Sequence, residues 1–263
     1  MKVQTLAPPS PIAAIVSHIV VLESNSVFDE AVLPLIANGY PSVTFQLTDP
    51  SRILTGEKKS YPLVLYGQNT KPIQLHAAGE IAVIAYFLYP WLLPSLFGYS
   101  ASELTDQGID LSLCGPARES NLKEQLLNSP SREDRLRLMD DYILRLSRSR
   151  KIVTDERLPY AIRTIRQHRG TLLLGDLQKE LFVTERTLQR LFGETVGLTP
   201  KLYSRICQFH AALNQLGCHG FSDMTQVAFD NGYADQSHLI RAFKEFTNLS
   251  PLEYRRLAQQ FPA

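Results

Sequence analysis

The sequence has few cysteines and no long apolar run. Its three cysteines, Cys114, Cys207 and Cys218, lie far apart, and none forms the CxxC pair of a structural zinc site or a dithiol redox centre. We expect them to be reduced thiols in or near a core. No stretch approaches the roughly 18–20 uninterrupted apolar residues of a membrane-spanning helix, and the start, MKVQTLAPPS, lacks the apolar core of a signal peptide. These absences predict a cytoplasmic protein with no membrane partner.

Motifs of enzymes and metalloproteins are also missing. The sequence contains no G-x-S-x-G nucleophile elbow, and no cysteine lies in a recognisable His-paired motif. A metal site in a small β-barrel needs several converging histidines and carboxylates. The region that is rich in strand-forming residues offers only His76 and the distant Glu80. We therefore expect no catalytic residue, no metal and no cofactor, and predict that the protein is not an enzyme.

The net charge is only +1, but the charges are unevenly distributed along the chain. Residues 1–128 carry 7 Lys and Arg against 11 Asp and Glu, residues 129–157 carry 8 against 6, and residues 158–263 carry 12 against 9. An acidic front half is a poor partner for a polyanion. Any contact with nucleic acid therefore belongs to the back half.

A chain of 263 residues predicts two domains, because domains usually span about 100–200 residues. Between Ser42 and about Tyr89, runs of Val, Ile, Leu, Phe and Tyr alternate with turn residues, which predicts strands. Breaks at residues 49–50, 67–69 and 78–79 have a spacing that suits an antiparallel sandwich or a small barrel. We place this β-rich domain at residues 1–128.

The region that follows reads as helical. In residues 131–150, Leu136, Met139, Ile143 and Leu146 recur at helical spacing with charged residues opposite. This amphipathic helix can connect two domains or form a dimer contact, and we place a helical linker at residues 129–157. Helical periodicity then continues almost to the end, with interruptions near residues 170, 193–200, 217–220 and 248–251, so residues 158–263 form an all-α domain.

The all-α domain contains an internal repeat. Each unit has a short helix, a tight turn, a second helix and a loop that ends in proline. Aligning residues 188–192 with residues 239–243 gives a constant offset of 51 that also brings Thr184 onto Asp235 and Pro200 onto Pro251. The side-chain oxygens of Thr184 and Asp235 can cap the free N–H groups of a helix that begins there.

The second helix of each unit has one apolar face and one polar face. The polar faces present Arg186, Gln189 and Arg190 in the first unit, and Gln236, Ser237, Ile240 and Arg241 in the second. Arg suits the O6/N7 edge of guanine or a phosphate, and Gln suits the N6/N7 edge of adenine. We predict that these seven residues bind DNA.

The repeat resembles the AraC/XylS family of transcription regulators over roughly residues 158–257. The resemblance is carried by Ala228, Gly232-Tyr233, Asp235-Gln236-Ser237-His238-Leu239, Arg241, Phe243-Lys244, Ser250-Pro251 and Tyr254-Arg255, and more weakly by Leu188, Arg190, Phe192, Gly197 and Pro200. It implies two helix-turn-helix units that are joined by a central helix over Pro200–Leu216 and enter successive major-groove segments, about 34 Å apart. The apolar Ile240 departs from the polar residues common at its position and suits a thymine methyl group.

This resemblance implies an α+β protein, with a sandwich or cupin-like barrel followed by the two helix-turn-helix units. It also implies double-stranded promoter DNA and RNA polymerase as partners, and activation as the commoner outcome. The front half is more faintly similar to an uncharacterised domain that precedes such modules. That similarity rests on Pro11–Val20, the stretch VLPLIANGYPSVTFQL, the turn YGQNTKP and the run from Phe87 to Leu111.

The role of the N-terminal domain has three readings. It can sense a small-molecule effector, with His18, His76 and the Tyr and Phe residues of the sheet as pocket lining, although aromatic residues at strand spacing also form ordinary cores. It can instead serve only for dimerisation or protein contact. An enzymatic role would need several convergent titratable groups in one cleft.

Further cations near the repeat also have two readings. Arg163, Arg166, His168 and Arg169 precede the first unit, where they can contact backbone phosphates or form a solvated helix face. His238 can touch a phosphate or pack at a helix–helix boundary.

Overall fold

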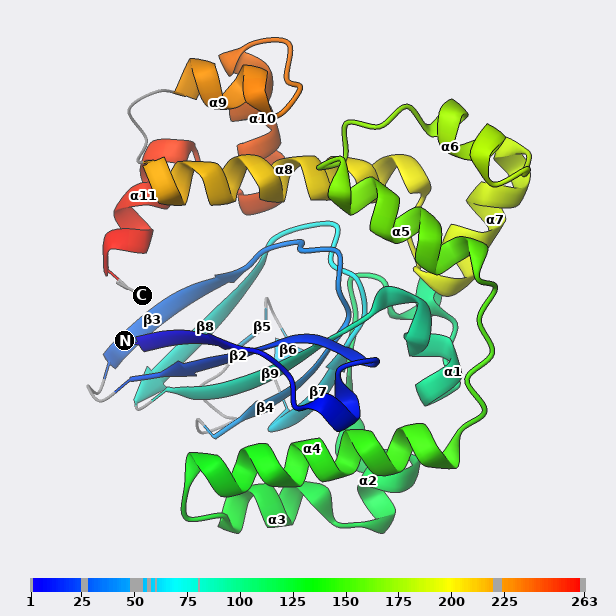
Figure 1. Ribbon diagram of the computed structural model, residues 1–263. Coiled ribbons are helices and arrows are strands. Elements are labelled where there is room, and N and C mark those ends of the chain that lie inside the picture. Colours follow the sequence, from blue (N-terminus) through cyan, green and yellow to red (C-terminus); the bar gives the residue numbers. More distant parts are fainter. Residues whose placement is uncertain are drawn as a thin grey trace.

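Two antiparallel sheets form the N-terminal part of the protein (Figure 1). The computed structural model describes residues 2–24, 28–47, 54–55, 58–59, 61–79, 81–219 and 224–260. One sheet has the strand order β1-β2-β9-β4-β7-β10 and the other β3-β8-β5-β6. The strands are β1 (Lys2–Leu6), β2 (Val16–Glu23), β3 (Phe28–Leu35), β4 (Ser42–Gln46), β5 (Leu54–Thr55), β6 (Lys58–Lys59), β7 (Leu63–Tyr66), β8 (Ile73–Gly79), β9 (Ala82–Leu88) and β10 (Gly108–Asp110).

The predicted strand region contains β4 to β9. Strands β1, β2 and β3, which precede it, and β10, which follows it, were missed. In β2 the pairing with β9 shifts register between Val16 and His18. Such a bulge interrupts the alternation of inward and outward side chains on which strand prediction depends. Of the predicted breaks, residues 67–69 form a loop, residues 78–79 end β8, and residues 49–50 lie outside the described part of the chain.

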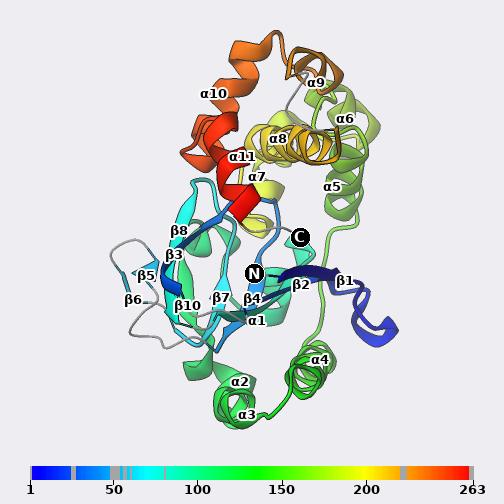
Figure 2. The ribbon, with the colours of Figure 1, turned by 90° about the vertical axis from the view of Figure 1, so that its left-hand side faces the viewer.

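The two faces of the six-stranded sheet have different coverings. Alternate residues of β4 and β9, such as Val43, Phe45 and Tyr86, face a core. The helices between residues 115 and 149 close this core on the side away from the C-terminal helices (Figure 2). Figure 2 shows these helices on one side of the sheets and the C-terminal helices on the other. The short elements that follow β9 are η3 (Pro90–Leu92), α1 (Leu93–Phe97), η4 (Ala101–Leu104), η5 (Leu111–Leu113), α2 (Gly115–Glu119) and α3 (Leu122–Asn128), and η1 (Ser10–Ile12) precedes β2.

Helix α4 (Arg132–Ser149) lies in the segment expected to link the domains, and it packs against the N-terminal core. Its residues Met139, Ile143 and Leu146 are buried in that core, so the chain's own sheet domain covers the apolar face that was considered for a dimer contact. The Tyr86 hydroxyl donates to Asp140 Oδ1 at 2.7 Å. Burial raises the pKa of both Tyr86 and Asp140. The extended residues 150–155 then lead to the C-terminal helices.

The C-terminal part is built around one long helix, α8 (Pro200–His219), which confirms the central helix predicted over Pro200–Leu216. In Figure 1 one group of helices lies at each end of α8. The others are α5 (Arg157–Gln167), α6 (Leu174–Glu180), α7 (Glu185–Thr195), α9 (Met224–Asp230), α10 (Gln236–Thr247) and α11 (Pro251–Gln260). The α+β prediction is therefore confirmed. No helix among the described residues combines the length and apolarity that a membrane crossing requires.

Two predicted interruptions were wrong in detail, because Gly193 lies inside α7 and Gly217 inside α8. A Cβ atom at either glycine would meet no other atom within 4 Å, so both sit on open helix faces. Neighbouring apolar residues, such as Phe192 and Leu216, are fully buried and hold both helices to the core. Tertiary packing here overrides the weak helix propensity of glycine.

The N-terminal loop after β3 penetrates the C-terminal core. Ala37 is fully buried among C-terminal side chains, and its carbonyl accepts a hydrogen bond from His210 Nε2 at 2.6 Å. The guanidinium of Arg166 lies 4.3 Å from the centre of the Tyr40 ring, close enough for a cation–π contact. At a second contact, Thr105 Oγ1 donates to the carbonyl of Gly197 at 2.8 Å.

Candidate nucleic-acid interface

The two predicted recognition helices begin where the caps were expected. Thr184 Oγ1 accepts a hydrogen bond from the N–H of Thr187 at 3.2 Å, and Asp235 Oδ1 accepts one from the N–H of His238 at 2.7 Å. Both capping residues have extended backbone conformations. The caps satisfy N–H groups that the first helical turn leaves free, which confirms the predicted starts of α7 and α10.

The loops that end these helices are also equivalent. Asn248 adopts the left-handed conformation with φ 58°, and Gly197 does so with φ 83°. Asn248 thus takes the place of the glycine in the second unit, because asparagine is the residue after glycine that best tolerates this conformation.

Apolar packing turns the predicted DNA-contacting residues away from the core. Leu188 and Phe192 of α7, and Leu239 and Phe243 of α10, are at most 2% exposed. On the opposite faces six of the seven predicted residues are exposed and Ile240 is half-buried. Those seven residues are Arg186, Gln189, Arg190, Gln236, Ser237, Ile240 and Arg241. Their side chains are placed as DNA-contacting residues would need to be, and their contacts with bases stay a prediction.

The two polar faces differ in how their charges are paired. Arg190 forms an ion pair with Glu194 at 2.9 Å, and Gln189 donates to Glu185 at 2.9 Å. By contrast, Arg241 makes no hydrogen bond or ion pair with any residue that the structure describes. The first face is thus partly neutralised by its own carboxylates.

The neighbouring cations have distinct surroundings. Arg163 is exposed, and His168 Nδ1 lies 2.9 Å from the carbonyl of Thr164 at the end of α5. Arg166 was considered for a phosphate contact, but it packs on Tyr40 at the domain contact instead. The His238 ring meets the Tyr233 ring edge-on at 5.1 Å, although His238 remains exposed.

A cavity of about 490 Å³ lies between the six-stranded sheet and the C-terminal helices α8 and α11. On β4 the alternate residues Ser42, Thr44 and Gln46 face it, opposite to the side that faces the core. The other lining residues are Val3, Val20, Ile36, Asn38, Tyr40, Tyr66, Gly67, Asn69, Val83, Ala85, Phe87, His210, Leu213 and Tyr254. The described lining is therefore mostly apolar, with hydroxyl and amide groups and the His210 imidazole, and contains no Lys, Arg, Asp or Glu.

Of the residues considered as pocket lining, some Tyr and Phe side chains of the sheet line this cavity, but His18 does not. His18 lies just behind its wall, where its ring stacks on Phe87 at 4.6 Å and meets Tyr40 edge-on at 5.2 Å. Burial lowers the pKa of His18, and nearby Arg166 adds to that effect. The side chain of His76 and all of Glu80 lie outside the described part. The polar positions of SVTFQ were missed, although their alternation in a strand was a usable signal.

The cysteines and possible metal ligands among the described residues form neither a disulfide nor a metal-binding group. Cys207 is buried and Cys114 half-buried, and neither is in a disulfide, as predicted, whereas the side chain of Cys218 is outside the described residues. Burial raises the pKa of Cys207 to about 11, which makes its thiol unreactive. The described residues contain no group of three or more His, Cys, Asp or Glu placed to hold a metal ion.

Two family models match the chain. Residues 177–257 match a helix-turn-helix domain, and residues 4–110 match a domain of unknown function, DUF6597. The HTH-type transcriptional activator RhaS of Escherichia fergusonii is 30% identical over 104 residues, which are 39% of this chain and 37% of that protein. The chain thus aligns with little more than a third of that relative.

Solved structures of ToxT from Vibrio cholerae share the fold of the whole chain. One covers 98% of this chain and 99% of its own, with 14% identity and a TM-score of 0.51. Another, from strain O395, is bound to (E)-4-(8-methylnaphthalen-1-yl)but-3-enoic acid and has 15% identity, the same coverage and a TM-score of 0.51. Residues 177–257 of this chain therefore form a helix-turn-helix domain, which follows a domain of unknown function in a chain that shares the fold of ToxT.

Proposed function

We propose that this protein is a transcription regulator that reads promoter DNA with two helices, α7 and α10. The observation that carries the proposal is their arrangement, because each begins at a side-chain cap, lies at one end of α8 and exposes a polar face (Figure 1). A helix-turn-helix unit places its second helix in the major groove. Two such units on one central helix suit two short sequence boxes about one helical turn apart.

Selection of bound duplexes from a random DNA pool tests this proposal. The wild-type protein should enrich two boxes, Arg190→Ala should relax one of them, and Arg241→Ala should relax the other. Each change should cost about 1–3 kcal/mol of specific binding. Arg137→Ala is a matched control, because it removes an exposed arginine from α4 on the far side of the sheet. Unchanged selection by both recognition-helix variants, beside an enriched wild-type sequence, would contradict the assignment.

The N-terminal domain, we propose, senses a small effector in the cavity between the sheet and α8. Its volume of about 490 Å³ lies within the range of roughly 300–1,000 Å³ of small-molecule sites. Apolar walls with a few neutral polar groups suit a molecule that has an apolar body and a hydrogen-bonding head. The compound held by ToxT is of this general kind, with an aromatic body and one polar end.

Isothermal titration with that naphthyl butenoic acid as the probe tests the cavity. Ala85 is only 8% exposed and lines the cavity, so Ala85→Trp should fill it and abolish binding. The DNA selection should be repeated with unliganded Ala85→Trp, which should enrich the same boxes. Binding of the probe to both proteins would place it elsewhere, whereas no binding together with a stable dimer in sedimentation would favour a purely oligomerising domain.

We also propose that RNA polymerase is a partner and that the outcome at the promoter is activation. Support comes from RhaS, whose name describes a transcriptional activator and which is 30% identical to this chain over 104 residues. A reporter placed downstream of the selected boxes should rise when the protein is expressed. A fall in the reporter would indicate repression instead.

A further inference from the structure

The two recognition helices carry the same pair of charges but use it differently. An arginine is followed four residues later by a glutamate in both, as Arg190 and Glu194 in α7 and as Arg241 and Glu245 in α10. In α7 the two residues form an ion pair at 2.9 Å. In α10 they do not, because Glu245 pairs with Arg205 of α8. Arg205, which lies outside the second helix-turn-helix unit, thus determines whether Glu245 can pair with Arg241 on the polar face of α10.

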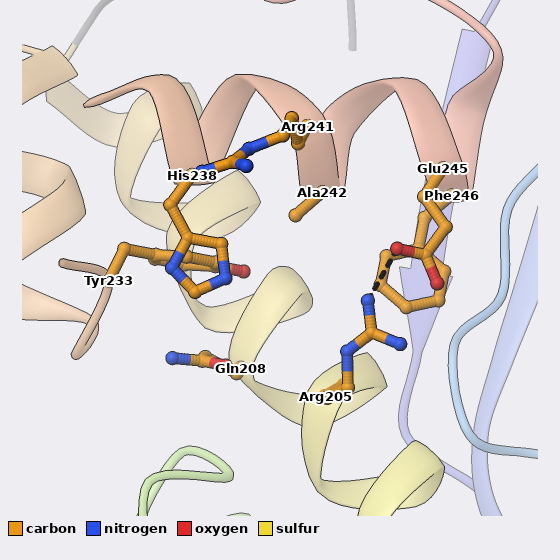
Figure 3. A pocket seen from close by; sticks show the side chains of 8 residues that line it. All are labelled: Arg205, Gln208, Tyr233, His238, Arg241, Ala242, Glu245 and Phe246. Carbon is orange, nitrogen blue, oxygen red and sulfur yellow. Dashed lines mark hydrogen bonds and ion pairs between the residues drawn. The ribbon is translucent and has the colours of Figure 1, made fainter. Parts of the chain in front are cut away.

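Arg205 is held in place for this contact. Its guanidinium lies 5.7 Å from the centre of the Phe246 ring, which is itself only 1% exposed. Arg205, Glu245 and Phe246 border a recess of about 300 Å³ between α8 and α10. Its other lining residues are Gln208, Tyr233, His238, Arg241 and Ala242. Figure 3 shows the Glu245 carboxylate turned toward Arg205, while the Arg241 side chain extends along α10 toward His238.

We propose that Arg205 is a positioning residue for DNA recognition, which holds Glu245 away from Arg241 and so leaves the Arg241 guanidinium free for DNA. Without Arg205, the Glu245 carboxylate is within one helical turn of Arg241 and forms the i,i+4 pair that α7 shows. That pair competes with DNA for the guanidinium and brings a negative charge toward the phosphates. The inference rests on the proposed role of α10 in DNA binding.

The test is a mutant cycle in the full-length protein, with affinity for the selected two-box duplex as the readout. Arg205→Ala should weaken binding about two- to fivefold, the effect of an exposed charge pair. Glu245→Gln alone should bind as well as the wild type or better. The double variant Arg205→Ala/Glu245→Gln should regain the affinity of Glu245→Gln, because the competing carboxylate is absent. Arg205→Lys should retain most of the affinity.

Controls separate this mechanism from a direct contact. Lys201→Ala removes another exposed cation from the same face of α8, four residues earlier, without touching Glu245, and Glu245→Gln should not alter its effect. If Arg205→Ala stays weak in the Glu245→Gln background, Arg205 binds a DNA phosphate itself and the proposal is wrong. If Arg205→Ala has no effect while Arg241→Ala relaxes its box, the proposal also fails, but the proposed function stands. If Arg241→Ala has no effect, the role of α10 itself is wrong.

Discussion

Single residues decide which charges on the polar faces of α7 and α10 are paired within the protein. Arg190 and Glu194 are each more than half exposed, so their ion pair has little net worth for stability. In the proposed complex with DNA, Arg190 has to leave Glu194 before it can contact a base or a phosphate. The sequence predicts the residue types on the polar face of α7. It does not predict that Arg190 pairs with Glu194, because an i,i+4 pair is only one of several rotamer choices for two long side chains.

We predict that Glu194→Gln strengthens binding to the selected duplex about two- to fivefold at low salt. The change frees Arg190 and removes a negative charge next to the phosphates. The gain should shrink as salt is raised, because screening weakens both effects. Fluorescence anisotropy at two salt concentrations measures it, with Glu119→Gln on α2 as the remote control. Equal gains in both variants would mean that only the overall charge matters.

Phe182 is strained and unusually exposed. It lies in the turn before α7 with φ 53°, and 95% of its surface is exposed. A left-handed conformation costs a non-glycine residue about 1 kcal/mol or more, and asparagine tolerates it better. We predict that Phe182→Asn raises the free energy of unfolding by about 0.5–1 kcal/mol, measured by urea denaturation. Phe229→Asn, at an exposed helical position of α9, should give no gain, since asparagine is a poor helix former.

At the scale of elements, the recurrence of the helix-turn-helix unit made most of the C-terminal domain predictable. Caps, apolar faces and loop ends are local features, and each has its counterpart 51 residues further on. Strand β2 was less predictable, because its bulge at Val16 and His18 breaks the local pattern. The polar wall of the cavity was not predictable for a similar reason. Thr44 and Gln46 have the pattern of ordinary strand residues, and only the packing of α8 and α11 over this face of the sheet shows that they are buried.

The loop after α10 provides a test of element ends. Asn248 has φ 58°, and its N–H bonds to the carbonyl of Lys244. Asn248→Ala should lower the free energy of unfolding by about 1 kcal/mol, because alanine resists the left-handed conformation. Asn248→Gly should leave it almost unchanged, since glycine adopts that conformation freely. Thermal unfolding of both variants measures the difference, and equal losses would mean that the asparagine side chain, not its backbone, holds the loop.

At the scale of the molecule, the two domains meet through contacts that no local pattern can reveal. His210 and Ala37 are 173 residues apart in sequence, and Thr105 and Gly197 are 92 apart. His210 also lines the cavity, so a molecule bound there touches the same helix that carries both helix-turn-helix units. Such an arrangement can couple the cavity to the spacing of the two recognition helices.

The burial of His210 should make stability depend on pH in a defined window. Burial lowers the pKa of His210 from 6.5 to about 4, and the charges of Arg166 and His18 act in the same direction. The hydrogen bond that His210 Nε2 donates to the Ala37 carbonyl opposes this shift only in part. Between these values the unfolded chain binds a proton that the folded chain does not. Stability that is fully present above pH 6.5 is therefore lost as the pH falls toward 4.

The measurement is urea denaturation of the wild type and of His210→Gln at pH 7 and at pH 5. Glutamine can still donate to the Ala37 carbonyl but does not titrate, so other acid-sensitive groups contribute equally to both proteins. The wild type should lose about 1–2 kcal/mol more than the variant between the two pH values. If both proteins lose the same amount, the His210 imidazole is not the source of the acid sensitivity, and the prediction is wrong.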